Sequence, residues 1–427
     1  MGERIINAAV LGAGTVGSGV YKLAKLMEED IFHKTGARLV IKKMLVKNIN
    51  KEREGIPSDI LTDDWKSIIE DGDIDIIVEL MGGIMPAKTY ILEAIAAGKQ
   101  VVTANKDLLA EHGEEIMSAA DLAGNDLQFE AAVAGAIPII RPLKQSMAGN
   151  HITEVMGIVN GTTNYILTKM TERGMDYTDA LAEATRLGYA EADPTADVEG
   201  YDAGRKMAIM ASIAFNSRVT FNHVYTEGIT KITADDIRYA KEFGYVVKLL
   251  GLARNVDGEI EVKVHPMLID ENHPLATVRD AFNAVFVHGD AMDDAMFMGR
   301  GAGQMPTASA VMGDIIDVMR DIVRDCCGRI GCSCYKKLNV KKIDETKSKF
   351  FLRINAHDRP GVLANIASVL GNNDVSIAQV VQKRRSGGVA ELVIITDEVE
   401  EKHFNDAMAV FKGMSVVQEI AGVIRVY

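Results

Sequence analysis

The sequence predicts an α/β protein with an N-terminal doubly wound parallel sheet, a central α+β part and a small C-terminal α+β unit. Three observations support this prediction. Strands and helices alternate over about the first 130 residues, a glycine-rich turn follows the first strand, and the strand–helix pattern restarts after a lysine-rich stretch near the C-terminus. Alternating strands and helices are typical of parallel sheets. A chain of 427 residues is also too long for one ordinary domain.

The composition excludes several classes of protein. With 48% hydrophobic and 25% charged residues, the chain matches globular proteins and not disordered, collagen-like or coiled-coil ones. A formal charge of −13 argues against nucleic acid or an anionic membrane as a partner. No run reaches the roughly 20 apolar residues of a membrane span, and no secretion leader precedes the first strand. We therefore expect a cytoplasmic protein without nucleic-acid or membrane partners.

The N-terminal part alternates short apolar runs with helical patterns. Its strands are expected at Ile5–Leu11, Leu39–Val46, Ile74–Leu80 and Gln100–Thr103, and its clearest helices at Ser18–Phe32 and Pro86–Ala97. Short apolar runs bounded by turns are typical of strands buried on both faces. We expect a Rossmann-like domain over residues 1–135, completed by residues 301–334.

The turn after the first strand has the spacing G-x-G-x-x-G. It consists of Gly12, Ala13, Gly14, Thr15, Val16 and Gly17. Such a loop lets the backbone approach a pyrophosphate, and the N-terminus of the next helix favours the negative charge. The pattern alone is weak, but here it lies between a strand and a helix near the start of the chain. It therefore predicts dinucleotide binding rather than an ordinary glycine turn.

The end of the second strand bears on which dinucleotide is bound. NAD-binding domains place Asp or Glu there to hold the ribose 2′-hydroxyl. This chain instead has Lys47 there, with Lys51 and Arg53 close behind, and residues 34–53 hold seven basic residues and one acid. A 2′-phosphate would be well bound by these cations. The pattern favours NADPH over NADH and makes Lys47 the expected contact of the 2′-phosphate. The alternative is that these lysines form a solvated surface with no ligand.

The pattern changes after about Glu130 and indicates an α+β domain over residues 136–300. Helices are expected at Tyr165–Glu172, Tyr177–Leu187 and Asp202–Phe215, and strands at Ile260–His265 and Asn283–His288. A helix expected at Thr307–Arg324 follows this domain, in the stretch that completes the N-terminal one. The lysine-rich residues 335–348 are interpreted as a linker. Residues 349–427 then follow a βαββαβ order, which is typical of a ferredoxin-like domain.

A cluster of acidic residues precedes the helix expected from Asp202. Residues 187–202 contain five carboxylates, and Asp202 and Lys206 stand four apart on the helix. That spacing places both side chains on one face, one turn apart. The pair is either a surface ion pair of little energetic value or a proton relay beside a nicotinamide, with the aspartate holding the substrate hydroxyl.

Residues 184–206 resemble the signature of the homoserine dehydrogenases. The matching positions are Ala184, Gly188, Tyr189, Ala190, Asp193, Pro194, Asp197, Val198, Gly200, Asp202 and Lys206. Three further stretches agree with that family: Thr103–Lys106, Asn160–Asn164, and Gly301–Gly303 with Pro306–Ala308. The resemblance covers about residues 5–335. Ala104 replaces the proline that the family usually has between Thr103 and Asn105, with little consequence expected.

The resemblance implies NADPH-dependent reduction of L-aspartate 4-semialdehyde to L-homoserine, a reversible step in threonine, methionine and isoleucine biosynthesis. Lys206 would be the general acid/base, and Asp202 would hold the substrate. Glu191 would bind the α-amino group, and Lys106 would assist proton transfer near substrate and nicotinamide. The cofactor contacts implied are the glycine loop, Lys47, Thr103, Lys106, Gly301 and Gly303. The domain over residues 136–300 would also form a homodimer, which the C-terminal units could extend to a homotetramer.

A monovalent cation, usually sodium, is implied by the same resemblance. Its ligands would be largely backbone oxygens in residues 130–137. The matching positions are Glu130, Val133, Gly135 and Ile137. Backbone carbonyl ligands leave no side-chain signature, so the residues alone do not reveal this site.

The C-terminal unit resembles an ACT domain. Residues 355–363 match its first strand–turn–helix, with a D-x-P-G-V-L-type core. Asp358 and the backbone around Gly361 would bind a free amino acid, and the family association points to feedback inhibition by L-threonine. A purely structural, dimerising domain is the alternative.

Other interpretations of the whole chain remain open at this stage. One is a dehydrogenase of another small amino acid or semialdehyde, and another is a non-catalytic sensor of NADPH and amino acids. A sensor would need neither Asp202 nor Lys206. The cysteines at 326, 327, 332 and 334 lack the paired C-x2-C spacing of a zinc site; reduced thiols are favoured over zinc, and a redox-sensitive disulfide is a further alternative.

Overall fold

The computed structural model describes residues 4–384 and 387–427. The chain divides into two compact units. The first consists of Met1–Val155, Ala208–Phe221 and Asn283–Leu338, and the second of Met156–Met207, Asn222–Phe282 and Asn339–Tyr427. Strand β7 (Ile152–Ile158) and helix α9 (Tyr201–Ala214) belong partly to each unit. Among the described helices, none has the length and apolar character needed to cross a membrane.

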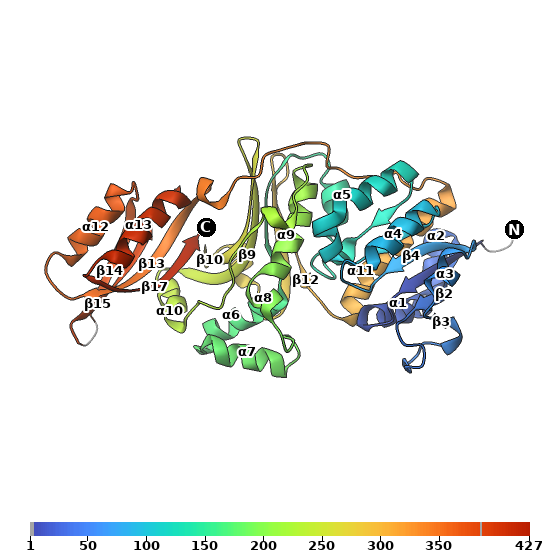
Figure 1. Cartoon of the computed structure of the whole chain (residues 1–427), viewed down its shortest axis with the longest axis horizontal. Coiled ribbons are helices and arrows are strands. Elements are labelled where there is room, and N and C mark those ends of the chain that lie inside the picture. The colour runs from blue at the N-terminus through green and yellow to red at the C-terminus, as the bar shows by residue number, and fades with distance from the viewer. Residues whose placement is uncertain (1–3, 385–386) are drawn as a thin grey trace. The chain divides into compact units, whose positions relative to one another are not determined.

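A six-stranded parallel sheet is the centre of the first unit (Figure 1). Its order is β3 (Leu61–Thr62), β2 (Ala37–Leu45), β1 (Arg4–Leu11), β4 (Ile74–Glu79), β5 (Gln100–Thr103) and β6 (Leu127–Gln128). All five neighbouring pairs are parallel. The order reverses direction at β1 and β4, as in a doubly wound sheet, so the predicted N-terminal fold is confirmed.

Helices flank this sheet and return to it late in the chain. They are α1 (Thr15–Leu26), α2 (Glu28–Thr35), α3 (Trp65–Ile69), α4 (Ala87–Ala96), α5 (Lys106–Ala123) and α11 (Gln304–Arg324). The single helix expected over residues 18–32 is wrong, because the chain leaves helical geometry at Met27 (φ −107°, ψ 17°). Helix α11 packs on α1 so closely that a Cβ at Gly19 would lie 2.9 Å from Ala308 Cβ. Residues after 303 therefore complete the core of the first unit.

The second unit contains a long hairpin and a set of helices. Its helices before residue 340 are α6 (Gly161–Arg173), α7 (Tyr177–Arg186), α8 (Thr195–Val198) and α10 (Ala234–Glu242). Its strands there are β8 (Tyr225–Thr226), β9 (Tyr245–Val256) and β10 (Glu259–Asp270). Strand β9 pairs antiparallel with β10 along their whole length. The sequence pattern had indicated only the first part of β10 and had missed β9. The first unit holds β11 (Phe282–Gly289) almost entirely and β12 (Asp293–Arg300).

The C-terminal residues form a βαββαβ domain, as predicted. Its elements are β13 (Lys347–His357), α12 (Val362–Asn372), β14 (Ile377–Arg384), β15 (Val389–Thr396), β16 (Val399–Glu400), α13 (Glu401–Gly413) and β17 (Val417–Val426). Helices α12 and α13 bury an apolar core against the sheet. Within the second unit, β17 also pairs in parallel with β10, through Arg425 and Val426. The domain therefore continues the sheet of β9 and β10 (Figure 1).

The stretch interpreted as a linker makes specific contacts on both sides of the boundary between the units. In the first unit, Lys336 N–H donates to the Asn216 carbonyl at 2.8 Å. In the second unit, Lys341 N–H donates to the Ile260 carbonyl at 2.9 Å. The basic residues of this stretch therefore belong to an ordered path along each unit.

Candidate active site

The glycine loop of the first unit has a geometry that only glycine permits at two positions. Gly12 has φ +106°, and a Cβ there would lie 2.9 Å from the Leu80 carbonyl oxygen. A Cβ at Gly17 would lie 2.0 Å from the Gly12 carbonyl oxygen. Gly14 caps α1, and a Cβ placed there would have no contact within 4 Å with described residues beyond its neighbours in the chain and helix. The loop is therefore tight on its protein side and open at Gly14, which suits a pyrophosphate against the helix N-terminus.

The carboxyl ends of β4 and β5 are joined by a buried carboxylate. Glu79 is fully buried, accepts the Thr103 hydroxyl at 2.7 Å, and accepts the Met81 N–H at 2.7 Å. Asn105 caps α5 by accepting the Leu108 N–H at 3.1 Å. Half-buried Lys106 is the first residue of that helix. The structure thus places Thr103 and Lys106 at the edge of the sheet where ligands of doubly wound folds bind.

The predicted basic loop follows β2 at the same edge. Gly12 N–H donates to the carbonyl of Leu45, the last residue of β2, at 2.9 Å. Lys47 is exposed two residues later. Arg53 is held by its donation to the carbonyls of Asn48 and Lys51, at 3.2 and 2.7 Å. The loop therefore presents exposed cations close to the start of the glycine loop.

In the second unit, an asparagine connects the acidic cluster to the helix lysine. Asn160 caps α6 by accepting the Thr163 N–H at 2.9 Å. Its Nδ2 donates to Asp197 Oδ1 at 2.7 Å and to Asp202 Oδ2 at 2.9 Å. Lys206 Nζ donates to the same Asp202 oxygen at 2.6 Å and to the Val159 carbonyl at 2.7 Å.

The Asp202–Lys206 pair is not a surface ion pair. Each side chain is only 12% exposed, and each has partners that fix its direction. A lysine held in this way presents its remaining donor capacity in one orientation, which is what proton transfer to a substrate oxygen requires. The structure therefore brings together the two residues that the helix spacing had singled out.

The other carboxylates of the cluster differ from Asp202. Burial raises the pKa of Asp197, against the lowering effect of its hydrogen bond from Asn160. Asp193 is exposed and accepts the Thr195 N–H at 3.1 Å, which begins α8. Glu191 is also exposed. The structure therefore does not bring Glu191 into the hydrogen-bonded cluster around Asp202.

The stretch expected to bind a cation forms a left-handed turn in the first unit. Ala134 and Gly135 have φ +55° and +57°, and a Cβ at Gly135 would lie 2.3 Å from the Gly301 carbonyl oxygen. The Glu130 carboxylate is occupied, because it accepts three N–H groups of residues 139–141 at 2.5 to 2.8 Å. Asn283, which abuts Gly301, is buried and its amide has no partner among the described residues. Carbonyl and amide oxygens are the ligands that a hard cation takes, so the residue types at this turn fit one.

The C-terminal domain keeps the turn that was expected to bind an amino acid. Asp358 is exposed, and its N–H donates to the Gly388 carbonyl at 2.8 Å. Gly361 has φ +86° and caps α12. The backbone around both residues is therefore fixed by the β13–α12 turn.

Sequence reasoning missed the buried charges that bind this domain to the rest of the second unit. Arg353 is 3% exposed and donates to Asp236 at 2.7 Å and to Glu391 at 2.9 Å. Arg425 donates to Glu401 at 2.6 Å and to Glu227 at 2.8 Å. The only signal in the sequence was a basic residue inside each apolar strand.

A parallel sheet with a tight glycine loop, together with a buried aspartate–lysine pair, defines an NAD(P)-dependent oxidoreductase. Three family models match the chain. They are "Homoserine dehydrogenase, NAD binding domain" over residues 12–130, "Homoserine dehydrogenase" over residues 138–316, and "ACT domain" over residues 350–413.

Known proteins match along the whole chain. A homoserine dehydrogenase of Corynebacterium glutamicum is 46% identical over 98% of this chain and 95% of its own, and one of Bacillus subtilis is 42% identical over 99% and 98%. The crystal structure of a homoserine dehydrogenase from Thiobacillus denitrificans has a TM-score of 0.95 at 40% identity, covering 100% of this chain and 99% of that one.

The chain belongs to the homoserine dehydrogenase family. It is an NAD(P)-dependent oxidoreductase of amino-acid biosynthesis that interconverts L-homoserine and L-aspartate 4-semialdehyde, and it carries an ACT regulatory domain. The alternatives of a different dehydrogenase and of a non-catalytic sensor are thereby set aside.

Proposed function

We propose that Lys206 is the proton donor and acceptor of the reaction and that Asp202 positions it. The observation that carries this proposal is the contact of Lys206 Nζ with both Asp202 Oδ2 and the Val159 carbonyl, in a pair of side chains that are 12% exposed. Two acceptors leave the ammonium one further proton to direct at a substrate oxygen. In the direction of homoserine oxidation, the neutral amine accepts that proton.

The chain's own contribution is charge placement. A nicotinamide, when bound, would supply or accept the hydride at the reacting carbon atom of the substrate. Lys206 holds a positive charge where the alkoxide oxygen develops, and then donates its proton to that oxygen. Asn160 keeps Asp202 in place by donating to the same oxygen that receives Lys206. The pair therefore acts as one unit, because neither partner can rotate without losing a hydrogen bond.

The remaining site residues follow the family resemblance. Lys106, at the start of α5, would assist proton transfer, and exposed Glu191 would accept the substrate ammonium. Thr103, Gly301 and Gly303 would contact the cofactor. Asp358 and Gly361 would hold an amino-acid effector, for which we propose L-threonine.

We infer a preference for NADPH over NADH from the loop after β2. The loop presents exposed Lys47, with Lys51 and Arg53 close by, and lacks a carboxylate at the position that would hold a 2′-hydroxyl. A hyperthermophilic archaeal homoserine dehydrogenase with a TM-score of 0.63 at 26% identity was solved in complex with NADPH, which supports the same choice.

A sodium ion or another monovalent cation is proposed for the turn at residues 130–137. The carbonyl oxygens of Glu130, Val133, Gly135 and Ile137 would hold it, since the Glu130 carboxylate is already occupied. Such an ion would fix the turn against Gly301. Homodimeric or homotetrameric assembly and a cytoplasmic location remain predictions from the family.

Substitution of Lys206 tests the central proposal. Lys206→Ala is expected to lower kcat for homoserine oxidation by about 10²–10⁴-fold while leaving NADP binding, followed by fluorescence titration, nearly unchanged. Lys66→Ala is the matched control, because Lys66 pairs with Glu70 at the same i,i+4 spacing but is 76% exposed. Wild-type turnover in Lys206→Ala would remove Lys206 from its role.

Effector binding is tested by titrating the wild-type activity with L-threonine, L-methionine and L-isoleucine. Inhibition by threonine that is lost in Asp358→Ala would support the proposed effector site. A response to none of the three would favour a purely structural C-terminal domain, without changing the assignment of Lys206.

A further inference from the structure

Four cysteines lie within nine residues of the first unit but in opposite electrostatic surroundings. Cys326 and Cys327 follow α11 beside carboxylates: Cys326 Sγ donates to Asp321 at 3.6 Å. Burial, with help from Asp126, raises the pKa of Cys327 to about 12. These two thiols are therefore expected to react slowly, because the reactive form of a cysteine is the thiolate.

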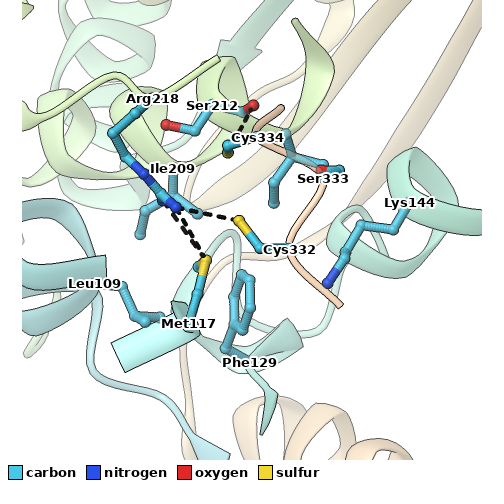
Figure 2. Close-up of a pocket in the computed structure, with 11 residues that line it drawn as sticks. Leu109, Met117, Phe129, Lys144, Ile209, Ser212, Arg218, Cys332, Ser333 and Cys334 are labelled. Carbon is cyan, nitrogen blue, oxygen red and sulfur yellow. Dashed lines mark hydrogen bonds between the residues drawn. The ribbon is translucent and has the colours of Figure 1, made fainter. Parts of the chain in front are cut away.

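Cys332 and Cys334 are instead partly exposed and line a small pocket of about 10 Å³, roughly the space of one water molecule. Figure 2 shows the Arg218 guanidinium reaching toward the sulfur atoms of Met117 and Cys332, with Lys144 on the other side of Cys332. Arg218 Nη2 donates to Cys332 Sγ at 3.2 Å. Arg218 Nε has no hydrogen-bond partner within the described part of the chain. The pocket therefore holds a guanidinium that is only partly satisfied by protein atoms.

The backbone holds Cys332 firmly in this pocket. Its N–H donates to both carboxylate oxygens of Asp121, at 3.1 Å each. A Cβ at the preceding Gly331 would lie 2.7 Å from Asp121 Oδ1, so the loop approaches α5 as closely as glycine permits. Cys334 Sγ lies 3.4 Å from the Ser212 carbonyl oxygen. Both cysteines are therefore held by contacts with neighbouring elements of the first unit.

The groups around Cys332 favour its thiolate. A side-chain hydrogen bond from Cys334, then the backbone of Cys334, and then the charge and hydrogen bond of Arg218 lower the pKa of Cys332 to about 5, against an opposing effect of burial. The same hydrogen bond and burial raise the pKa of Cys334. The other charged groups facing the site are Lys144, whose pKa is lowered by burial, and Asp121. One thiol is therefore ionised while its neighbour keeps its proton.

A metal ion does not suit this arrangement. Two cationic side chains approach the sulfur atoms, and their charge disfavours a further cation. Across the described ranges, no cluster of three or more His, Cys, Asp or Glu side chains could hold a metal. A negatively charged reagent is the better match for Arg218 and Lys144.

We propose that Cys332 and Cys334 form a covalent modification site, at which Cys332 exchanges with a carboxylate-bearing low-molecular-weight disulfide and Cys334 resolves the product. In the first step the Cys332 sulfur attacks one sulfur of the reagent. A protein–reagent disulfide forms, the reagent's own disulfide bond breaks, and one thiolate leaves and takes a proton from water. The charges of Arg218 and Lys144 attract the anionic reagent to Cys332, whose side chain is partly exposed.

The second step is internal to the pocket. The Cys334 thiol loses its proton, and its sulfur attacks the Cys332 sulfur. The mixed disulfide breaks and the second reagent thiolate leaves. In sum, the two cysteines lose two electrons and two protons, and the reagent disulfide is reduced to two thiols.

The test uses the full-length reduced protein with glutathione disulfide and peptide mass mapping at about pH 6.5, where an ordinary thiol is only about 1% ionised. We expect the peptide containing Cys332 to react at least about tenfold faster than the one containing Cys326 and Cys327, and to end as an internal disulfide. Its rate should stay nearly constant from about pH 6.5 to 8. Equal labelling of all four cysteines, or a rate rising about tenfold per pH unit, would overturn the proposal.

Three comparisons sharpen this test. Cys334→Ser should stop at the mixed disulfide on Cys332, whereas Cys327→Ser should react like the wild type. Arg218→Gln should slow the exchange about tenfold, and Arg320→Gln, an exposed arginine outside the pocket, should not. Cystamine, a cationic disulfide, should react more slowly than glutathione disulfide. Faster reaction with cystamine, or complete protection of Cys332 by added Zn²⁺, would contradict the anionic reagent.

Discussion

The two units differ in the chemical groups that they hold in fixed positions. In the first unit these are mainly backbone groups, as in the glycine loop, where a Cβ at Gly17 would lie 2.0 Å from a carbonyl oxygen. In the second unit they are polar and charged side chains that hydrogen-bond to one another. Asp202 accepts hydrogen bonds from Asn160 at 2.9 Å and from Lys206 at 2.6 Å.

This difference follows from what each unit has to recognise. A pyrophosphate is bound by N–H groups that any sequence carries, so the requirement on the sequence is only that no side chain block the approach. A proton must be transferred by a group that ionises, so it requires particular side chains in fixed positions. The first unit should therefore be sensitive to added atoms, and the second to removed charges.

Among the variants that compare the two units, removal of the Asp202 charge should have the largest effect on turnover. Asp202→Asn removes the charge that holds Lys206 Nζ at 2.6 Å while keeping the shape of the side chain, and should lower kcat by about 100-fold or more. Asp197→Asn is the comparison, because Asp197 accepts a hydrogen bond from Asn160, whereas Lys206 donates to Asp202 and to the Val159 carbonyl. The Asp197→Asn substitution should lower kcat by about tenfold or less. Equal losses in steady-state kinetics would show that the whole cluster, and not the pair, matters.

Buried ion pairs in the second unit also stabilise the fold. Their contribution is measured by the free energy of unfolding and not by the rate of turnover. Arg353→Ala leaves Asp236 and Glu391, which are at most 1% exposed, without their cation. We expect a loss of about 3–5 kcal/mol in the free energy of unfolding, measured in urea. Arg238→Ala breaks the Arg238–Asp235 pair on the same helix, whose side chains are 56% and 46% exposed, and should cost about 1 kcal/mol at most. Similar losses for both would contradict a structural role of the buried pair.

The sequence predicts the sites of the two units unequally well. The glycine loop and the Asp202–Lys206 pair were visible because each is local: six consecutive residues in one case and one helical turn in the other. The role of Asn160 was not visible, because its partners Asp197 and Asp202 lie 37 and 42 residues away. Residue spacing predicts contacts only within one helix or one turn, and not contacts between distant parts of the chain.

The fold was predictable for a related reason. Short apolar runs separated by turns recur in the sequence of the parallel sheet and of the βαββαβ domain, and these local patterns predict both. Strand β9 was missed because its run contains Lys248, which is buried and donates to the carbonyl of Val278 and to Asn164 Oδ1. The pairing of β17 with β10 joins residues far apart in the chain, and no local pattern specifies it.

Two glycines of the first unit separate stability from binding. Gly17→Ala forces a methyl group against the Gly12 carbonyl and should lower the free energy of unfolding by about 1–3 kcal/mol even without cofactor. Gly14→Ala meets no described atom within 4 Å, so it should leave that free energy unchanged and raise the KM for NADP. Thermal unfolding of the free protein and cofactor kinetics measure both. A destabilised Gly14→Ala with normal KM would refute an open face for the pyrophosphate.

The smallest effect is expected where the first unit does use a charged side chain. Lys47 is exposed, so a contact with the 2′-phosphate is worth about 1.5 kcal/mol, which corresponds to roughly tenfold in binding. Lys47→Ala should lower kcat/KM for NADP by about that factor and leave kcat/KM for NAD unchanged. Lys25→Ala, an exposed lysine near the end of α1, is the matched control. Because the contact is exposed, the NADP preference of the wild type should also shrink with added salt. If neither Lys47→Ala nor salt changed the preference for NADP over NAD, the backbone of the loop would have to discriminate between the two cofactors. Cofactor specificity would then be a further case in which the first unit acts through its backbone and not through charged side chains.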